Sequence, residues 1–265
     1  MEFHFERRAS ASALWARRIA VFSGVLLITA GAGHRYGAVD TIPFFWLLGL
    51  VGGLALLAIV LAGVGFFRLW TNGDRGGRAA TRAVLVAVVV LIPFGIGGWR
   101  AYSLPRLTDI SSDIASPPPF PTAQRRRPAD ANPIRPATAE EAEAQLLAYP
   151  AVTGRRYSQP VDRLNEIIEV VLTQLGWKAA HHTDPQMQTA ESLIEIVARS
   201  LVFGFVSDVV VRVVDEGEST YVDVRSNSRY GIHDLGDNAE KIQRFLAALD
   251  AEVAARNMPI NVEEN

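Results

Sequence analysis

The sequence contains no cysteine among its 265 residues. This absence excludes a disulfide framework, thiol catalysis and a metal site with cysteine ligands. It does not identify the cellular compartment, because an oxidising space permits disulfides without requiring them. The sequence also lacks the Gly-x-Ser-x-Gly turn that presents the nucleophile of many serine hydrolases.

Charged residues are absent from three apolar stretches of the amino-terminal half, at 19–33, 42–67 and 83–99. The second stretch exceeds the roughly 20 residues that a helix needs to cross a bilayer, and the third lies in the usual range. Trp99 and Tyr102 suit a membrane interface. We expect spans at about 19–36, 42–67 and 83–101. Without acids or bases inside them, a proton or ion pathway is not expected.

The first apolar stretch has two interpretations. It follows Arg17 and Arg18, so it can be the hydrophobic region of a cleaved signal peptide or a retained short span. We favour a retained span because Trp15 and Tyr36 can extend it at both ends.

The arginines predict the orientation of these spans. Residues 1–102 carry ten arginines and four acids, and the first-to-second loop contains only Arg35, whereas arginines cluster before the first span and at 68–82. Because positive charge stays on the cytoplasmic side, three crossings leave residues 103–265 outside. If the first stretch is cleaved, the basic loop at 68–82 still gives the same result.

The exported half has no basic surface of the kind that nucleic acid requires. Residues 103–265 carry 16 basic and 24 acidic residues, a net charge of 16 − 24 = −8. The run Arg125-Arg126-Arg127 lies in a proline-rich stretch, and we interpret it as solvated. No nucleic-acid partner is expected.

Small residues on the second span suggest association between helices. Gly49 and Gly53 are four residues apart, as are Ala58 and Ala62, so two backbones can approach closely on that face. This spacing allows homo- or hetero-association in the membrane.

Residues 103–137 are rich in proline, serine and aspartate, and we expect an extended linker there. Asp109, Ser111, Ser112 and Asp113 offer oxygen ligands to a hard cation. Such side chains more often shape turns by bonding to nearby backbone groups, and we predict no metal site.

An α+β domain is expected over residues 138–256, followed by a tail at 257–265. Helices are predicted at 139–148, at 162–175 before Gly176, and at about 237–256, where Asp237 and Glu240 resemble a capping box. Between them, apolar β-branched runs at 177–182, 192–205, 209–214 and 220–226 indicate strands. This order predicts an antiparallel sheet with helices packed on one face, and we expect the other face to be wet.

Three motifs are TDISSDIASPPPF at 108–120, FGFVSDVVVRV at 203–213 and VDVRSNSRYGIHDLGDNAEKIQRFLAAL at 222–249. Together they resemble the DUF1499 family of bacterial envelope and plastid proteins of unknown function. The resemblance implies a domain attached to a membrane or exported across it, with no catalytic residues to carry over. The family's motif residues that stand here are Asp109, Ser111, Pro118, Phe120, Phe203, Asp208, Arg225, Ser226, Ser228, Arg229, Gly231, Asp234, Leu235, Gly236, Asn238 and Ala239.

The polar stretches contain residue types that occur in catalytic and metal sites. Ser226 or Ser228 with His233 and Asp234 has the residue types of a serine hydrolase triad, but His233 and Asp234 are adjacent in sequence. A second group, His181, His182 and Asp184, offers metal ligands, although neighbouring side chains on a strand point to opposite faces. We assign no catalytic residue, metal or cofactor.

A structural interpretation accounts for the same stretch without a ligand. Arg225 or Arg229 can pair with Asp223 or Asp234 through two parallel hydrogen bonds. In addition, Gly231 can supply a positive φ, and Asp234 or Asp237 can cap the last helix.

The ligand hypothesis uses the guanidinium groups and the positive amino end of the last helix as an anion site. Its residues are Arg225, Ser226, Ser228, Arg229, Asp234 and Asn238. The ligand would be an anionic lipid or an envelope component, bound by a non-enzymatic periplasmic domain of a bacterial inner-membrane protein. The alternatives are a hydrolase that acts on envelope material and a structural subunit of a membrane complex.

A reporter enzyme fused after Asn265 should be active only when exported, because the clustered arginines orient the spans. Activity confined to the cytoplasm, or release of the chain from vesicles by alkaline carbonate, would contradict this topology.

Overall fold

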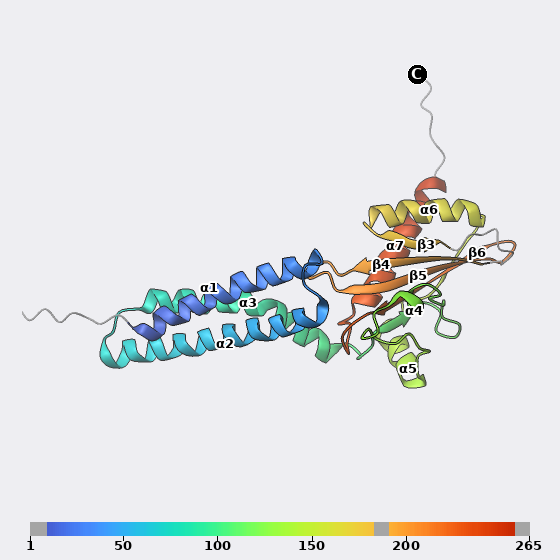
Figure 1. Cartoon of the computed structure of the whole chain (residues 1–265). Coiled ribbons are helices and arrows are strands. Elements are labelled where there is room, and N and C mark those ends of the chain that lie inside the picture. The colour runs from blue at the N-terminus through green and yellow to red at the C-terminus, as the bar shows by residue number, and fades with distance from the viewer. Residues whose placement is uncertain (1–9, 183–190, 258–265) are drawn as a thin grey trace, which may run out of the picture. The chain divides into compact units, whose positions relative to one another are not determined.

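The structure is a computed structural model that describes residues 10–182 and 191–257. Its residues fall into two compact units, Met1–Trp99 with Leu201–Gly204, and Arg100–Ser200 with Phe205–Asn265. The first unit contains the long apolar helices, and the second contains the sheet domain (Figure 1).

Three helices make up the amino-terminal half: α1 (Ala11–Arg35), α2 (Thr41–Asn72) and α3 (Gly77–Ser103). All three are long and apolar enough to cross a membrane. Each helix buries small residues at helical spacing, which lets the backbones approach closely. These fully buried alanines are Ala13, Ala16 and Ala20 on α1, Ala55, Ala58 and Ala62 on α2, and Ala80, Ala83 and Ala87 on α3.

Large apolar side chains cover the outside of the three helices. Phe22, Trp46 and Val89 are 57%, 78% and 63% exposed. A surface of this kind is unusual in water but is required of a helix bundle that faces lipid. The observed helices therefore fit the three expected spans.

The predicted small-residue face of α2 divides into two parts. Ala58 and Ala62 are buried against the other helices. Gly49 and Gly53 are exposed, and no atom lies within 4 Å of a Cβ built on either residue. Association with another chain through these glycines stays a prediction.

The second unit contains a six-stranded antiparallel sheet with the order β1-β6-β5-β4-β3, in which β2 also pairs with β6. Strands β5 and β6 form the hairpin expected around Gly217. The strands are β1 (Asp109–Ser111), β2 (Arg155–Tyr157), β3 (Lys178–His182), β4 (Glu191–Arg199), β5 (Val206–Asp215) and β6 (Thr220–Ser228).

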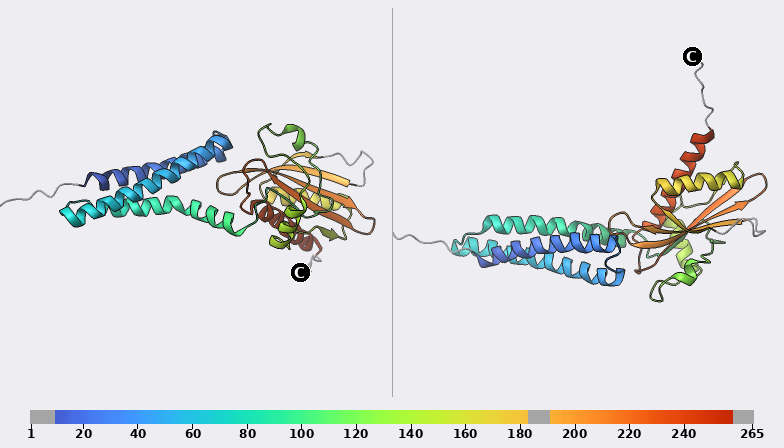
Figure 2. Two further views of the ribbon diagram at one scale, coloured as in Figure 1. Left: turned by 90° about the horizontal axis from the view of Figure 1, so that it is seen from below. Right: turned by 45° about the horizontal axis from the view of Figure 1, so that its top comes forward.

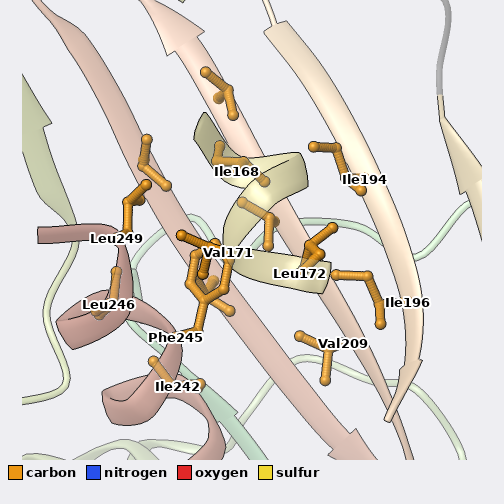
Figure 3. Close-up of a cluster of buried hydrophobic side chains, with 14 of the residues drawn as sticks. Ile168, Val171, Leu172, Ile194, Ile196, Val209, Ile242, Phe245, Leu246 and Leu249 are labelled. Atoms are coloured by element: carbon orange, nitrogen blue, oxygen red, sulfur yellow. The ribbon is translucent and has the colours of Figure 1, made fainter. Parts of the chain in front are cut away.

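Helices α6 (Val161–Gln174) and α7 (Asp237–Asn257) cover one face of the sheet, as the sequence predicts (Figures 1 and 2). Gly176, with φ 68°, follows the end of α6 in the left-handed conformation that favours glycine. Figure 3 shows the core between the layers. Its labelled side chains are Ile168, Val171 and Leu172 of α6, Ile242, Phe245, Leu246 and Leu249 of α7, and Ile194, Ile196 and Val209 of the sheet.

The short helix α5 (Ala139–Ala148) has the predicted bounds and a capping box at its start. The Thr138 hydroxyl accepts a hydrogen bond from the Glu141 amide, and the Glu141 carboxylate accepts one from the Thr138 amide. Glu141 also pairs with Arg135, whose guanidinium lowers the pKa of this carboxyl to about 2.

Side chains alternate along β6 as expected, but its second face is not wet. Val222 and Val224 enter the core beneath the helices, while Asp223 and Arg225 point to the opposite face. Asp223 is 0% exposed and Arg225 is 6% exposed. The prediction of a solvated face is therefore wrong, because another part of the chain covers it.

That covering part is the cover segment, residues 112–136, which lies within the stretch expected to be a linker. It follows β1 and contains α4 (Ala123–Arg126), and it lies on the side of the sheet opposite to α6 (Figures 1 and 2). Phe120 is 1% exposed and packs with Leu193 and Val210. The Glu195 carboxylate of β4 accepts hydrogen bonds from the Thr122 and Ala123 amides at 2.8 and 2.7 Å.

The sequence of the cover segment resembles a linker because it has neither helical nor strand periodicity. Its prolines prevent regular hydrogen bonding within the segment. Contacts to the sheet replace that bonding, so the expected linker of residues 103–137 is largely part of the folded domain.

Phe120→Ala should destabilise the sheet domain by about 3–5 kcal/mol, since it removes a buried aromatic ring and leaves a cavity. Leu147→Ala is a matched control, because Leu147 is 78% exposed, and it should change stability by at most about 0.5 kcal/mol. Denaturant unfolding of the full chain in detergent measures both effects. Equal stability of the two variants would show that the cover segment is not part of the cooperative fold.

Candidate functional site

The carboxy-terminal half of β6 sends buried polar side chains to both faces of the sheet. Arg225 and Asn227 point toward the cover segment, whereas Ser226 and Ser228 point toward α7. All four residues are at most 8% exposed. Because buried polar groups are stable only with hydrogen-bond partners, each face needs its own bonding network.

Arg225 uses four of its five N–H donors within the chain. Its Nε and Nη2 donate to the two carboxylate oxygens of Asp109 at 2.9 and 2.8 Å. The carbonyl oxygens of Pro118 and Arg135 accept two further hydrogen bonds. The Phe120 ring centroid lies 5.2 Å from the guanidinium carbon. This arrangement leaves little donor capacity for a ligand.

A second carboxylate, that of Asp208 on β5, binds two arginines. Arg127 Nε donates to Asp208 Oδ2 at 2.6 Å, while Arg229 donates to both carboxylate oxygens at 3.0 and 2.7 Å. The side chains of Asp208 and Arg127 are 3% and 6% exposed. Hydrogen bonding to Asp208 raises the pKa of Arg229.

Asn227 joins the two ion-pair groups. Its Oδ1 accepts a hydrogen bond from Arg127 at 2.8 Å, and its Nδ2 donates one to Asp109 at 2.6 Å. The result is a continuous chain of side chains, which we call the arginine network: Arg225, Asp109, Asn227, Arg127, Asp208 and Arg229. It ties the cover segment to β5 and β6.

On the helix face, Asn238 of α7 forms the centre of a second network. It accepts a hydrogen bond from the Ser226 hydroxyl at 2.7 Å and donates one to the Ser228 hydroxyl at 2.9 Å. Nearby, Lys241 Nζ donates to the Ser207 hydroxyl at 3.0 Å and to Asp237. These bonds fix the first turns of α7 against β5 and β6.

The first amides of α7 are bonded to a carboxylate of the chain itself. Asp234 accepts hydrogen bonds from the Gly236 and Asn238 amides at 2.9 and 3.0 Å. Burial nevertheless raises the pKa of Asp234. The predicted cap therefore comes from Asp234, while Asp237 pairs with Lys241 and Glu240 pairs with Arg100.

The chain reaches this cap through a tight loop whose backbone favours glycine. Gly231 has the predicted positive φ, at 92°, and Gly236 follows at 81°. A Cβ on Gly236 would lie 2.7 Å from the side chain of Leu104, so any other residue would disturb the contact.

The six residues of the predicted anion site do not converge on one notch. Arg225 and Arg229 belong to the arginine network beneath the cover segment. Ser226, Ser228 and Asn238 bond to one another on the opposite face, and Asp234 occupies the amides proposed for the anion.

The expected two-bond arginine pairs are present, but two of their partners differ. Arg225 pairs with Asp109, and Arg229 pairs with Asp208. Asp223 pairs with Arg212 at 2.6 Å instead. The sequence predicts partners within one loop, whereas strand pairing brings Asp109 from β1 and Asp208 from β5.

The arrangement of the triad residues also differs from that of a hydrolase. Ser226 and Ser228 bond to Asn238, while the His233 ring lies against the Leu104 carbonyl and the Leu235 amide. The metal alternative with His181, His182 and Asp184 cannot be described, because these side chains lie outside the described residues. The Ser111 hydroxyl donates to the Asp113 carbonyl at 2.7 Å, as its turn-forming interpretation predicts.

Several residues of the two networks were missed or misinterpreted from sequence. Arg127 belongs to the run interpreted as solvated; Arg125 and Arg126 are exposed, but the Arg127 side chain is only 6% exposed. Ser207, Asp208 and Lys241 were given no role. The available signal was Asp208, a charge directly before the apolar run Val209–Val211, since buried charges in proteins are usually paired.

Asp208→Asn should destabilise the domain by about 3–5 kcal/mol, because it leaves the guanidinium groups of Arg127 and Arg229, 6% and 23% exposed, without their carboxylate. Asp130→Asn makes the same chemical change at an exposed position and should alter stability by about 0.5 kcal/mol or less. Denaturant unfolding of both variants in detergent measures the difference. A stable Asp208→Asn protein would rule out a structural role for the arginine network.

Comparison with known proteins gives one family. A family model described as "Protein of unknown function (DUF1499)" matches residues 109–249. No curated protein matches. No solved structure matches either. The matched range begins at β1, so it includes the cover segment and both networks. The chain therefore belongs to the DUF1499 family, whose function is unknown.

Proposed function

We propose that this protein is a non-enzymatic membrane protein that holds a binding domain on the periplasmic side of a bacterial inner membrane. One observation carries the proposal. The polar motif side chains Arg225, Ser226, Ser228, Arg229, Asp234 and Asn238 all bond to other groups of the chain. These bonds stabilise a fixed shape and leave no activated nucleophile among the six residues.

The anchor and the orientation come from the amino-terminal half. Three apolar helices with alanine-rich contacts and large outward side chains suit a bilayer. The arginine distribution supports an exported position for residues 103–265. A domain attached in this way stays close to lipid headgroups, so an anionic headgroup or envelope component is the proposed ligand class.

A hydrolase is the second candidate, and a specific contact favours it. Lys241 Nζ lies 3.0 Å from the Ser207 hydroxyl, and serine–lysine pairs activate the nucleophile in some hydrolases. However, Ser207 and Lys241 are only 1% and 4% exposed, and Lys241 pairs with Asp237. A substrate therefore has no route to this serine in the observed conformation, and a lysine paired with a carboxylate is a poor base.

A fluorophosphonate probe distinguishes the two candidates. Applied to the full chain in native membranes, the probe should give no labelling, because the Ser207 hydroxyl beside Lys241 is buried. Ser207→Ala is the matched control. Labelling of the wild-type protein that disappears in Ser207→Ala would contradict the non-enzymatic proposal.

Ligand identification uses the same pair of proteins. Wild-type and Ser207→Ala chains, purified from solubilised membranes, should retain the same anionic lipid or envelope component. If neither retains one, the binding part of the proposal fails while the anchoring part still holds.

A further inference from the structure

The loop between β6 and α7, residues 229–236, is bonded to the chain segment that leaves α3. Arg106 Nε donates to the Ile232 carbonyl at 3.3 Å, and the Asp234 amide donates to the Leu107 carbonyl at 2.9 Å. Arg100 Nη1 donates to the Leu235 carbonyl at 3.3 Å. The loop is therefore held beside residues 100–107 within the same folded unit.

Chain connectivity then determines how close this loop is to the membrane. Trp99 is the last residue of the third apolar stretch, and α3 continues only to Ser103. At 1.5 Å per helical residue, Leu104 lies about 8 Å beyond Trp99 along the helix axis. If α3 spans the bilayer with Trp99 at the interface, the loop lies at headgroup level.

The exposed side chains of this region suit a lipid surface. Ile232 is 70% exposed at the tip of the loop, and Tyr102 is 86% exposed at the end of α3. Arg106 is exposed, and no carboxylate in the described part of the chain pairs with it. An exposed apolar residue beside a cation, with an aromatic residue four positions before that cation in the sequence, is the composition found at membrane interfaces.

The charge distribution of the domain favours contact between this loop and an anionic membrane. The net charge of residues 103–265 is 16 − 24 = −8, so an anionic membrane repels most of the domain surface. The Arg106 side chain beside Ile232 is a local exception to that repulsion.

The tip is also rigid before it meets a ligand. The Asn132 side chain donates hydrogen bonds to the Ser228 and Gly231 carbonyls at 3.0 and 2.8 Å, and the Asn132 amide donates to the Arg229 carbonyl at 2.6 Å. Docking a preorganised loop costs little conformational entropy.

We propose that Ile232 inserts into the headgroup layer of the protein's own membrane while Arg106 binds anionic headgroups, so that the domain docks on the bilayer. This inference rests on the proposed function, because it requires the third apolar helix to span the membrane. It assigns a role to the family's β6–α7 motif: the buried networks fix the shape of a membrane-contacting loop.

The absence of cysteine permits a direct test. Ile232→Cys gives the full chain a single thiol for an environment-sensitive fluorophore. The matched control is Glu218→Cys at the β5–β6 turn, which is also exposed. The control precedes β6 and Ile232 follows it, and a nine-residue strand is about 26 Å long.

Both labelled chains are placed in nanodiscs of phosphatidylcholine with phosphatidylglycerol. The label at 232 should shift its emission to the blue and lose most of its intensity to a lipid-borne quencher, whereas the label at 218 should respond only to aqueous iodide. Equal quenching of both labels by iodide would overturn the inference. A blue shift at 232 without lipid quenching would also overturn it, since protein would then cover the residue.

Arg106→Gln tests the headgroup interaction. A surface arginine contributes about fivefold to binding of an anionic membrane, so the ratio of lipid-buried to water-exposed label should fall about fivefold in this variant. Arg126→Gln, a change at another exposed arginine, should have little effect. No change for Arg106→Gln would overturn the headgroup contact.

Failure of the membrane topology is detected separately. A membrane-impermeant thiol reagent should label Glu218→Cys only from the exported side of oriented vesicles. Labelling of Glu218→Cys from the cytoplasmic side overturns the proposed function. If Glu218→Cys is labelled from the exported side but iodide reaches the label at Ile232→Cys, only the docking of the loop is overturned.

Discussion

The fold of the sheet domain depends on the pairing of three largely buried arginines with two aspartates. Asp208 binds Arg127 and Arg229, while Asp109 binds Arg225, and Asn227 joins the two groups. An unpaired charge at such a depth would be strongly destabilising. The cover segment supplies Arg127 and β1 supplies Asp109, so the sheet cannot keep its polar face buried without them.

This constraint explains why one face of the sheet has an apolar core and the other a polar one. The helix face is filled by branched aliphatic side chains and Phe245. On the opposite face, Phe120, Leu193 and Val210 form only a small apolar cluster beside the ion pairs. Apolar packing provides most of the stabilisation, and directional ion pairs determine where an irregular segment lies.

The same pairing bears on function. Arginine, serine and aspartate in one loop suggest an anion site or a triad, yet here each bonds to other residues of the domain. The networks hold the shape of the loop at residues 229–236. This loop is available for interaction, because Ile232 is exposed and Arg106 lies beside it. The polar residues of the β6–α7 motif therefore maintain the shape of the loop and do not need to contact a ligand themselves.

The helices and strands with a regular hydrophobic pattern could be predicted from the sequence. Uncharged stretches gave the three long helices, because helix length and hydropathy are local properties. The apolar stripe of α7, which includes Ile242 and Leu246, could also be predicted, as could the alternation of side chains between the two faces of β6. The arginine–aspartate pairing and the position of residues 112–136 over the sheet depend on the tertiary structure. Arg127 and Asp208 lie 81 residues apart along the chain, and Arg225 and Asp109 lie 116 apart. No local pattern encodes a pairing that arises only when strands align.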